Sequence, residues 1–132
     1  MNFADLDGLA RRPPNAEALV AAGEALGIDW PDDYVAFMHV TDGGDGFLGD
    51  NYVSFWSAGD LVDRNQGYQI EEYAPNLVVF GSDGGGEAFA FDRSTQPASI
   101  VMVPFIGLDS AIPQGQTFRD FLSRLRAGGP FD

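Results

Sequence analysis

The stretch LVVFGSDGGGEAFAFD, from Leu77 to Asp92, constrains the fold of this chain more than any other part of it. It begins with a short apolar run that favours a strand, and the GSDGGG that follows is made of residue types that tolerate left-handed backbone angles. After the glycines, Phe89 and Phe91 alternate with two alanines, so the two rings share one face of an extended strand. Two strands joined by a glycine-rich turn form a β-hairpin. We therefore predict that this hairpin is the centre of a sheet and that helices pack on its phenylalanine face.

The segments on either side of the hairpin predict an α+β fold. Apolar residues at helical spacing, together with capping residues, predict helices at 15–26, 31–41, 58–65 and from 117 onward. Composition predicts further strands at 52–56 and 100–103, and loops at 42–50, 68–76 and 104–116. We therefore expect a central, mainly antiparallel β-sheet flanked by N-terminal helices and a C-terminal helix. The chain length predicts a single domain over 1–132.

Charge is the most unusual feature of the composition. The chain has 20 acidic residues against 7 basic ones, a net charge of −13, and every basic residue is arginine. An acidic surface of this kind repels phosphate backbones and anionic lipid, so we expect neither a nucleic acid nor a membrane as partner. It attracts a cationic protein and speeds the encounter. Solubility alone is the other explanation of the same charge.

The cellular compartment is suggested by two absences from the sequence. No cysteine is present, which excludes disulfides and thiolate metal sites and fits a reducing cytosol. The first residues, MNFADLDGLARR, have no apolar run of signal-peptide length, and the sequence holds no apolar span of 18 residues. We therefore expect a cytoplasmic protein.

Residue types that most catalytic sites need are scarce in this chain. His39 is the sole histidine, no Gly-x-Ser-x-Gly elbow holds a serine nucleophile, and without lysine there is no phosphate-loop lysine. The carboxylate-rich stretch 42–50 departs from EF-hand spacing, so calcium is not predicted. We expect no catalytic residue, no metal and no cofactor. A small hydrolase that uses a carboxylate pair including Asp83 is the alternative that so many acidic residues leave open.

A series of short motifs resembles the SUKH superfamily over roughly 14–126. In chain order these are PDDY with a following phenylalanine, TDGG, GSDGGG before an aromatic–aspartate pair, and TF followed by FL. Family turns often place asparagine before the paired glycines, where this chain has Asp42. The matching positions are Pro31, Tyr34, Phe37, Gly43, Gly44, Gly81, Asp83, Gly84, Gly86, Asp92, Phe118 and Phe121.

The resemblance implies an α+β domain in which these positions serve mainly as fold determinants, and it implies a non-catalytic role. The superfamily includes fungal cell-wall synthesis regulators and bacterial immunity proteins that bind and neutralise polymorphic toxins, often nucleases or deaminases. A nuclease must be basic to hold its substrate, so the acidic chain suits an inhibitor that competes for that cleft. We expect an immunity protein with a basic cognate toxin as its partner; a regulatory scaffold domain is the alternative.

Carboxylates and aromatic side chains between the second helix and the hairpin are the candidate partner contacts. The carboxylates would steer a cationic partner, and the aromatic rings would anchor it if they are exposed. The candidate carboxylates are Asp32, Asp33, Asp42, Asp45, Asp50, Asp60, Asp63, Glu71 and Glu72. The candidate aromatic anchors are Tyr52, Trp56, Tyr68 and Tyr73. We expect a monomer, although the sequence does not fix the oligomeric state.

Overall fold

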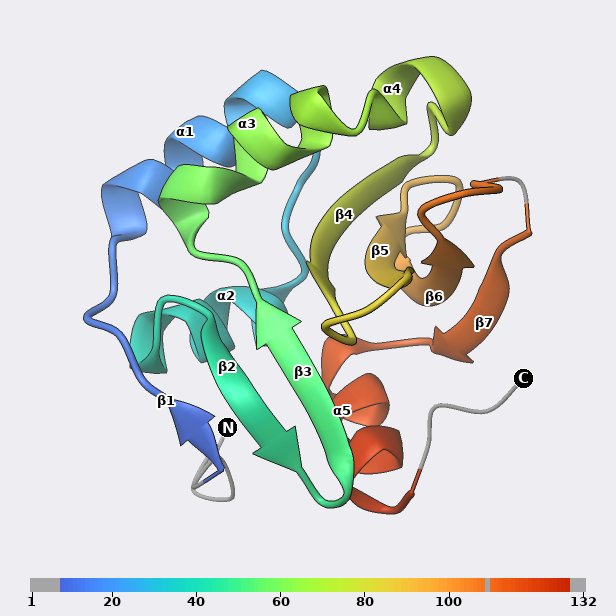
Figure 1. The fold of residues 1–132 in the computed structure, drawn as a ribbon. Coiled ribbons are helices and arrows are strands. Elements are labelled where there is room, and N and C mark those ends of the chain that lie inside the picture. Colours follow the sequence, from blue (N-terminus) through green and yellow to red (C-terminus); the bar gives the residue numbers. More distant parts are fainter. Residues whose placement is uncertain (1–7, 109, 129–132) are drawn as a thin grey trace.

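The computed structural model describes residues 8–108 and 110–128. Within that part of the chain, the centre is a seven-stranded sheet whose strand order follows the sequence, and each strand runs antiparallel to the next (Figure 1). The strands are β1 (Leu9–Ala10), β2 (Gly44–Leu48), β3 (Asn51–Phe55), β4 (Leu77–Ser82), β5 (Glu87–Asp92), β6 (Ser99–Pro104) and β7 (Ile112–Gly115). The predicted domain also includes 1–7, 109 and 129–132, which lie outside the described residues.

The described residues also form five helices, which confirms the α+β class. The side chain of Asn15 caps the first helix by accepting a hydrogen bond from the Ala18 N–H at 3.1 Å, as the sequence predicted. The side chain of Thr117 caps the last helix in the same way, from the Asp120 N–H at 3.0 Å. The helices are α1 (Ala16–Leu26), α2 (Asp32–Val40), α3 (Ala58–Gly67), α4 (Ile70–Tyr73) and α5 (Phe118–Arg126).

The phenylalanine face of the β4–β5 hairpin carries the core, which confirms the prediction made from its sequence. Helix α2 places the Tyr34 ring 5.7 Å from that of Phe80 and 5.0 Å from that of Phe91, and all three side chains are buried. Helix α5 places the Phe118 ring 5.7 Å from that of Phe80. Contacts of this edge-to-face kind add about 0.5–1.5 kcal/mol per pair beyond the burial of area. They hold α2 and α5 on one face of the sheet.

The alanines of the hairpin are buried as well. Ala88 and Ala90 are fully buried on β5. Helices α3 and α4 contact β4 (Figure 1). The sequence predicted helices on the phenylalanine face, so the contact of α3 and α4 with β4 is an addition.

The predicted loop at 42–50 is wrong, because it contains β2. This strand pairs with β3 along its whole length, from Gly44 to Leu48, and with β1 on its other edge. Because glycine is uncommon in strands, the sequence did not indicate a strand here. In β2, however, glycine permits close pairing with the neighbouring strands. A Cβ at Gly46 would collide with the carbonyl oxygen of Gly8 on the neighbouring segment. Tertiary pairing therefore overrides the local preference for a loop.

Two other predicted loops, 68–76 and 104–116, also contain regular structure. The first holds the short helix α4, and the second holds β7, an edge strand in which Pro113 has no N–H to leave unpaired. The helix predicted at 31–41 ends one residue earlier. Thr41 follows α2 in an extended conformation, and its hydroxyl accepts a hydrogen bond from the Arg12 N–H at 3.0 Å. The short elements α4 and β7 depend on contacts with their neighbours, and their own sequences carry little signal of a helix or strand.

Candidate partner-binding surface

Strand register places four side chains on one uncovered face of β2 and β3. Asp45 pairs with Ser54, and Phe47 pairs with Tyr52. Side chains two residues apart share a face of a strand, so these four lie together, and we call them the outer face. The alternate residues of both strands point the other way into the core, where Leu48, Val53 and Phe55 are buried.

An exposed aromatic pair occupies one end of the outer face. The ring centroids of Phe47 and Tyr52 are 5.4 Å apart in an edge-to-face arrangement. Phe47 is 56% exposed and Tyr52 is 42% exposed. Two large rings held together in water, with fixed mutual geometry, can insert into a partner at little cost in side-chain entropy.

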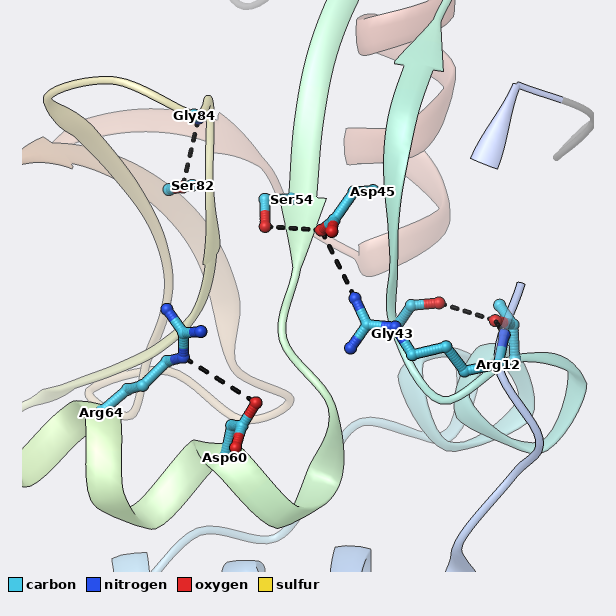
Figure 2. Close-up of polar contacts among 9 residues, drawn as sticks. Arg12, Gly43, Asp45, Ser54, Asp60, Arg64, Ser82 and Gly84 are labelled. Carbon is cyan, nitrogen blue, oxygen red and sulfur yellow. Dashed lines mark hydrogen bonds and ion pairs between the residues drawn. The ribbon is translucent and has the colours of Figure 1, made fainter. Parts of the chain in front are cut away.

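Asp45 lies at the centre of the polar end of the outer face. Its carboxylate accepts a hydrogen bond from the Ser54 hydroxyl at 2.6 Å and pairs with the Arg12 guanidinium at 3.4 Å, as Figure 2 shows. The Arg12 backbone is itself tied to Thr41 through its N–H. Asp45 is therefore held in one orientation, and part of its charge is balanced within the chain.

Trp56 continues the outward-facing series of β3 but is buried, with 4% exposure, so it is not the exposed anchor that the sequence suggested. The Arg64 guanidinium of α3 lies over its ring, 5.2 Å from the centroid, and pairs with Asp60 at 4.0 Å. The Tyr68 ring lies almost parallel to that of Trp56, with centroids 6.2 Å apart. Phe105 then stacks on Tyr68 at 4.3 Å. We call these three rings the aromatic stack.

A groove opens where the aromatic stack reaches the surface. Its volume is about 440 Å³, and Tyr68, Tyr73, Phe105, Gly107 and Leu108 line it. Tyr68 is 45% exposed and Tyr73 is 62% exposed. Both tyrosines were predicted as anchors, and the structure brings them to one site.

Two of the candidate carboxylates cap helices. Asp42 accepts a hydrogen bond from the Ala58 N–H at 2.8 Å, at the start of α3. Asp33 accepts one from the Arg119 N–H at 2.9 Å, in the first turn of α5. A carboxylate at a helix N-terminus satisfies a free N–H and complements the helix dipole. These two side chains therefore support the fold directly.

The other candidate carboxylates are spread over several parts of the surface. Asp50 lies in the turn between β2 and β3, and Asp63 is exposed on α3. Glu71 and Glu72 border a hollow between α4 and the C-terminal end of α1. Asp32 borders a different hollow near the start of α2. The candidate carboxylates therefore do not form one cluster but lie over several parts of the surface, and their part in partner binding stays a prediction.

Burial shifts the pKa of one side chain in the core. It raises the pKa of Tyr34 far above the usual range for a tyrosine, and the nearby Asp42 carboxylate adds to the shift. The Tyr34 hydroxyl is buried and makes no hydrogen bond. This group belongs to the α2 side of the core and does not reach the outer face.

Among the residues that the structure describes, no three histidine, cysteine, aspartate or glutamate side chains gather closely enough to hold a metal ion. The same residues include no helix with the length and apolar character needed to cross a membrane.

Nearly the whole chain matches one known protein family. The sequence model of the SMI1 / KNR4 family (SUKH-1) matches residues 13–124. The chain belongs to the SUKH-1 family. No match to an individual curated protein accompanies the family match. Membership of SUKH-1 confirms the resemblance read from the motifs, and it supports an immunity or regulatory domain that acts through protein–protein contacts.

The positions that resemble SUKH motifs lie in the core or in turns of this SUKH-1 chain. A Cβ at Gly81 would lie 2.6 Å from the Ser54 carbonyl oxygen, so only glycine lets β3 and β4 meet there. Asp83 organises the hairpin turn by accepting hydrogen bonds from the Gly85 and Glu87 N–H groups. The remaining positions are Pro31 and Asp92 beside turns, the buried rings Tyr34, Phe37, Phe118 and Phe121, and Gly43, Gly44, Gly84 and Gly86 in connections or strand ends.

Sequence reasoning missed three residues of these surfaces in the SUKH-1 chain. Phe47 lay in a stretch interpreted as a loop, although aspartate and phenylalanine two residues apart within GDGFL are the trace of a strand face. Phe105 follows a strand by one residue and gave no signal. Arg12 reaches Asp45 across 33 residues, a pairing that only the tertiary structure reveals.

Proposed function

We propose that this SUKH-1 chain is a cytoplasmic, non-catalytic immunity protein that neutralises a basic cognate toxin, a nuclease or deaminase, by stoichiometric binding. The observation that carries the proposal is the outer face, where Phe47 and Tyr52 stand exposed beside Asp45 on a chain of net charge −13. The family match supports the general class of immunity or regulatory domain.

Charge and aromatic contacts would play different parts in binding. A nuclease holds its substrate in a basic cleft, so a molecule with a strong negative field is drawn towards that cleft and associates quickly. Rate enhancement of this kind falls as salt is added. The Phe47–Tyr52 pair, once buried against the toxin, would slow dissociation. Fast arrival and slow release together give an inhibitor that acts at one equivalent.

Four carboxylates of this chain have structural roles. Asp33 and Asp42 cap helices, Asp83 organises the hairpin turn, and Asp45 is paired with Arg12. These roles favour a binding protein over the hydrolase alternative that was built on Asp83.

Capture from native lysate on the immobilised chain, washed at low and then high salt, tests the proposal. A basic polypeptide retained at low salt is purified and assayed for nuclease or deaminase activity against increasing amounts of the chain. We expect activity to vanish at one equivalent. Full activity in the presence of excess chain would overturn neutralisation. Recovery of a housekeeping assembly without such an activity would favour the regulatory scaffold.

Substitutions on the outer face locate the binding site. We expect the Phe47→Ala/Tyr52→Ala double variant to bind the captured partner about 30-fold or more weakly, since truncated interface anchors commonly cost 2 kcal/mol or more. Val20→Ala, which removes another exposed apolar side chain on α1, is the matched control and should leave affinity unchanged. Equal affinity of the double variant and the control would remove the outer face from the interface.

A further inference from the structure

We propose that the groove lined by Tyr68, Tyr73 and Phe105 receives an arginine side chain of the basic partner. This inference rests on the proposed function, because it names a specific contact within that binding. It concerns a site beyond the outer face, at the surface end of the aromatic stack.

The rings of the groove are held in a fixed geometry. Tyr68 lies between Trp56 and Phe105, with interplanar angles of 10° and 25°, so its ring is held in place on both sides. Tyr73 approaches from α4 and is the most exposed ring of the groove. Fixed, partly exposed aromatic faces present their negative quadrupole to solvent and attract cations.

The same aromatic stack already binds a guanidinium at Trp56. Arg64 lies 5.2 Å from the centroid of the Trp56 ring, and its ion pair with Asp60 orients it. Arg64 is therefore committed to Trp56 and Asp60. The side chains that line the groove are all uncharged, so none of them supplies a cation there.

The helices that end at the two tyrosines of the groove are acidic. Helices α3 and α4 carry four carboxylates, on Asp60, Asp63, Glu71 and Glu72, against one arginine, which is paired. A cation that approaches the groove therefore meets an attractive field, and an anion is repelled. Ile106, next to Phe105, is 95% exposed and can contact the aliphatic stem of an entering side chain.

Arginine fits this groove better than lysine does. A guanidinium is planar and weakly hydrated, so it can stack on Tyr73 or Phe105, whereas a lysine ammonium remains strongly hydrated. The occupant that the groove selects is therefore an arginine presented by a basic protein surface.

Titration of the full chain with the peptide Ac-Gly-Arg-Gly-NH₂ tests the inference without the partner. Tyrosine ring signals are followed by NMR after ¹³C labelling of the rings, and the neutral peptide Ac-Gly-citrulline-Gly-NH₂ serves as the matched control. We expect saturable shifts of Tyr68 and Tyr73, and about fivefold or more weaker binding of the citrulline peptide because the cation–π attraction is lost. The signals of Tyr34 and Tyr52 should not move.

Two variants complete the test. Tyr73→Leu should abolish the peptide-induced shift of Tyr68, and Val20→Leu, at an exposed position on α1, should leave it intact. Equal binding of the two peptides, or an unchanged Tyr68 shift in Tyr73→Leu, would overturn the inference. Neither result tests neutralisation. The proposed function is overturned only if the chain fails to inhibit the toxin. Failure of the groove and failure of the function are therefore separate outcomes.

Discussion

The side-chain amide of Asn65 makes both hydrogen bonds of the Val79 backbone. Its nitrogen donates to the Val79 carbonyl and its oxygen accepts from the Val79 N–H, each at 2.9 Å. β3 pairs with β4 only at Gly81 and Ser82, so this edge of β4 would be unpaired at Val79 without the amide. Asn65 is buried on α3 and stands in for a residue of a neighbouring strand. The helix and the central sheet are therefore joined by polar as well as apolar contacts.

We predict that Asn65→Leu lowers the free energy of unfolding by about 2–4 kcal/mol. Leucine has a similar size but leaves the Val79 N–H and carbonyl buried without partners, and each unsatisfied group costs about 1–3 kcal/mol. Urea denaturation followed by circular dichroism measures the change. Gln66→Leu, at the exposed neighbouring position on α3, is the control and should shift stability by less than about 0.5 kcal/mol. Equal effects of the two substitutions would contradict the role assigned to Asn65.

Local sequence patterns predicted those helices and strands that are determined by their own residues. The β4–β5 hairpin, the Asn15 cap and the buried rings of α2 and α5 were all read correctly, because alternation, capping and helical spacing are short-range features. β2 was missed because its glycines serve contacts with β1 and β3, which are distant in sequence. No local rule could have identified Asn65, since its partner lies 14 residues away on a strand.

The candidate surface was only partly predictable for the same reason. Tyr52, Tyr68 and Tyr73 were chosen as aromatic residues in a carboxylate-rich part of the chain, and all three are exposed. Trp56 was chosen on the same grounds but is buried under Arg64 and Tyr68. Exposure depends on which element covers a residue, so composition alone could not separate these cases.

We predict that Asp42, and not Ser57, determines the stability of the start of α3. Ser57 occupies the N-cap position but makes no capping hydrogen bond with its side chain, whereas Asp42 accepts one from Ala58. Asp42→Ala should therefore cost about 1 kcal/mol, as loss of a cap does. Asp42→Asn should retain most of the stability, and Ser57→Ala should be nearly neutral. Urea denaturation of the three variants decides the matter, and a larger loss in Ser57→Ala would reverse the assignment.

We predict that Arg93 holds the C-terminal end of α1. Its guanidinium donates to the carbonyl oxygens of Leu26 and Gly27, at 3.1 Å each, and to that of Pro75. α1 has no basic residue in its last turn, so this arginine supplies the positive charge that complements the helix dipole there. Arg93→Ala should lower the free energy of unfolding by about 1–3 kcal/mol, because hydrogen bonds from a charged donor are lost.

Hydrogen exchange distinguishes this local role of Arg93 from a general loss of stability. Amide protection should fall first in the last turn of α1 and around Pro75, the two segments that the guanidinium joins. Arg119→Ala, which removes an exposed arginine on α5, is the control. The exchange pattern of this variant should match that of the parent chain. Uniformly faster exchange across the sheet in Arg93→Ala would argue against a local clamp.

We predict that Tyr34 makes the fold sensitive to alkaline pH. Burial raises its pKa in the folded chain, so above the ordinary tyrosine pKa of about 10 the unfolded chain releases a proton that the folded chain retains. The contribution of Tyr34 to stability is therefore constant below that pH and falls above it, by up to about 1.4 kcal/mol per pH unit. Tyr34→Phe, which removes a buried hydroxyl that has no hydrogen-bond partner, should be about as stable at pH 8 and lose most of this slope. Urea midpoints at pH 8, 9, 10 and 11 measure the slope, and an equal slope in Tyr34→Phe would contradict the role assigned to Tyr34.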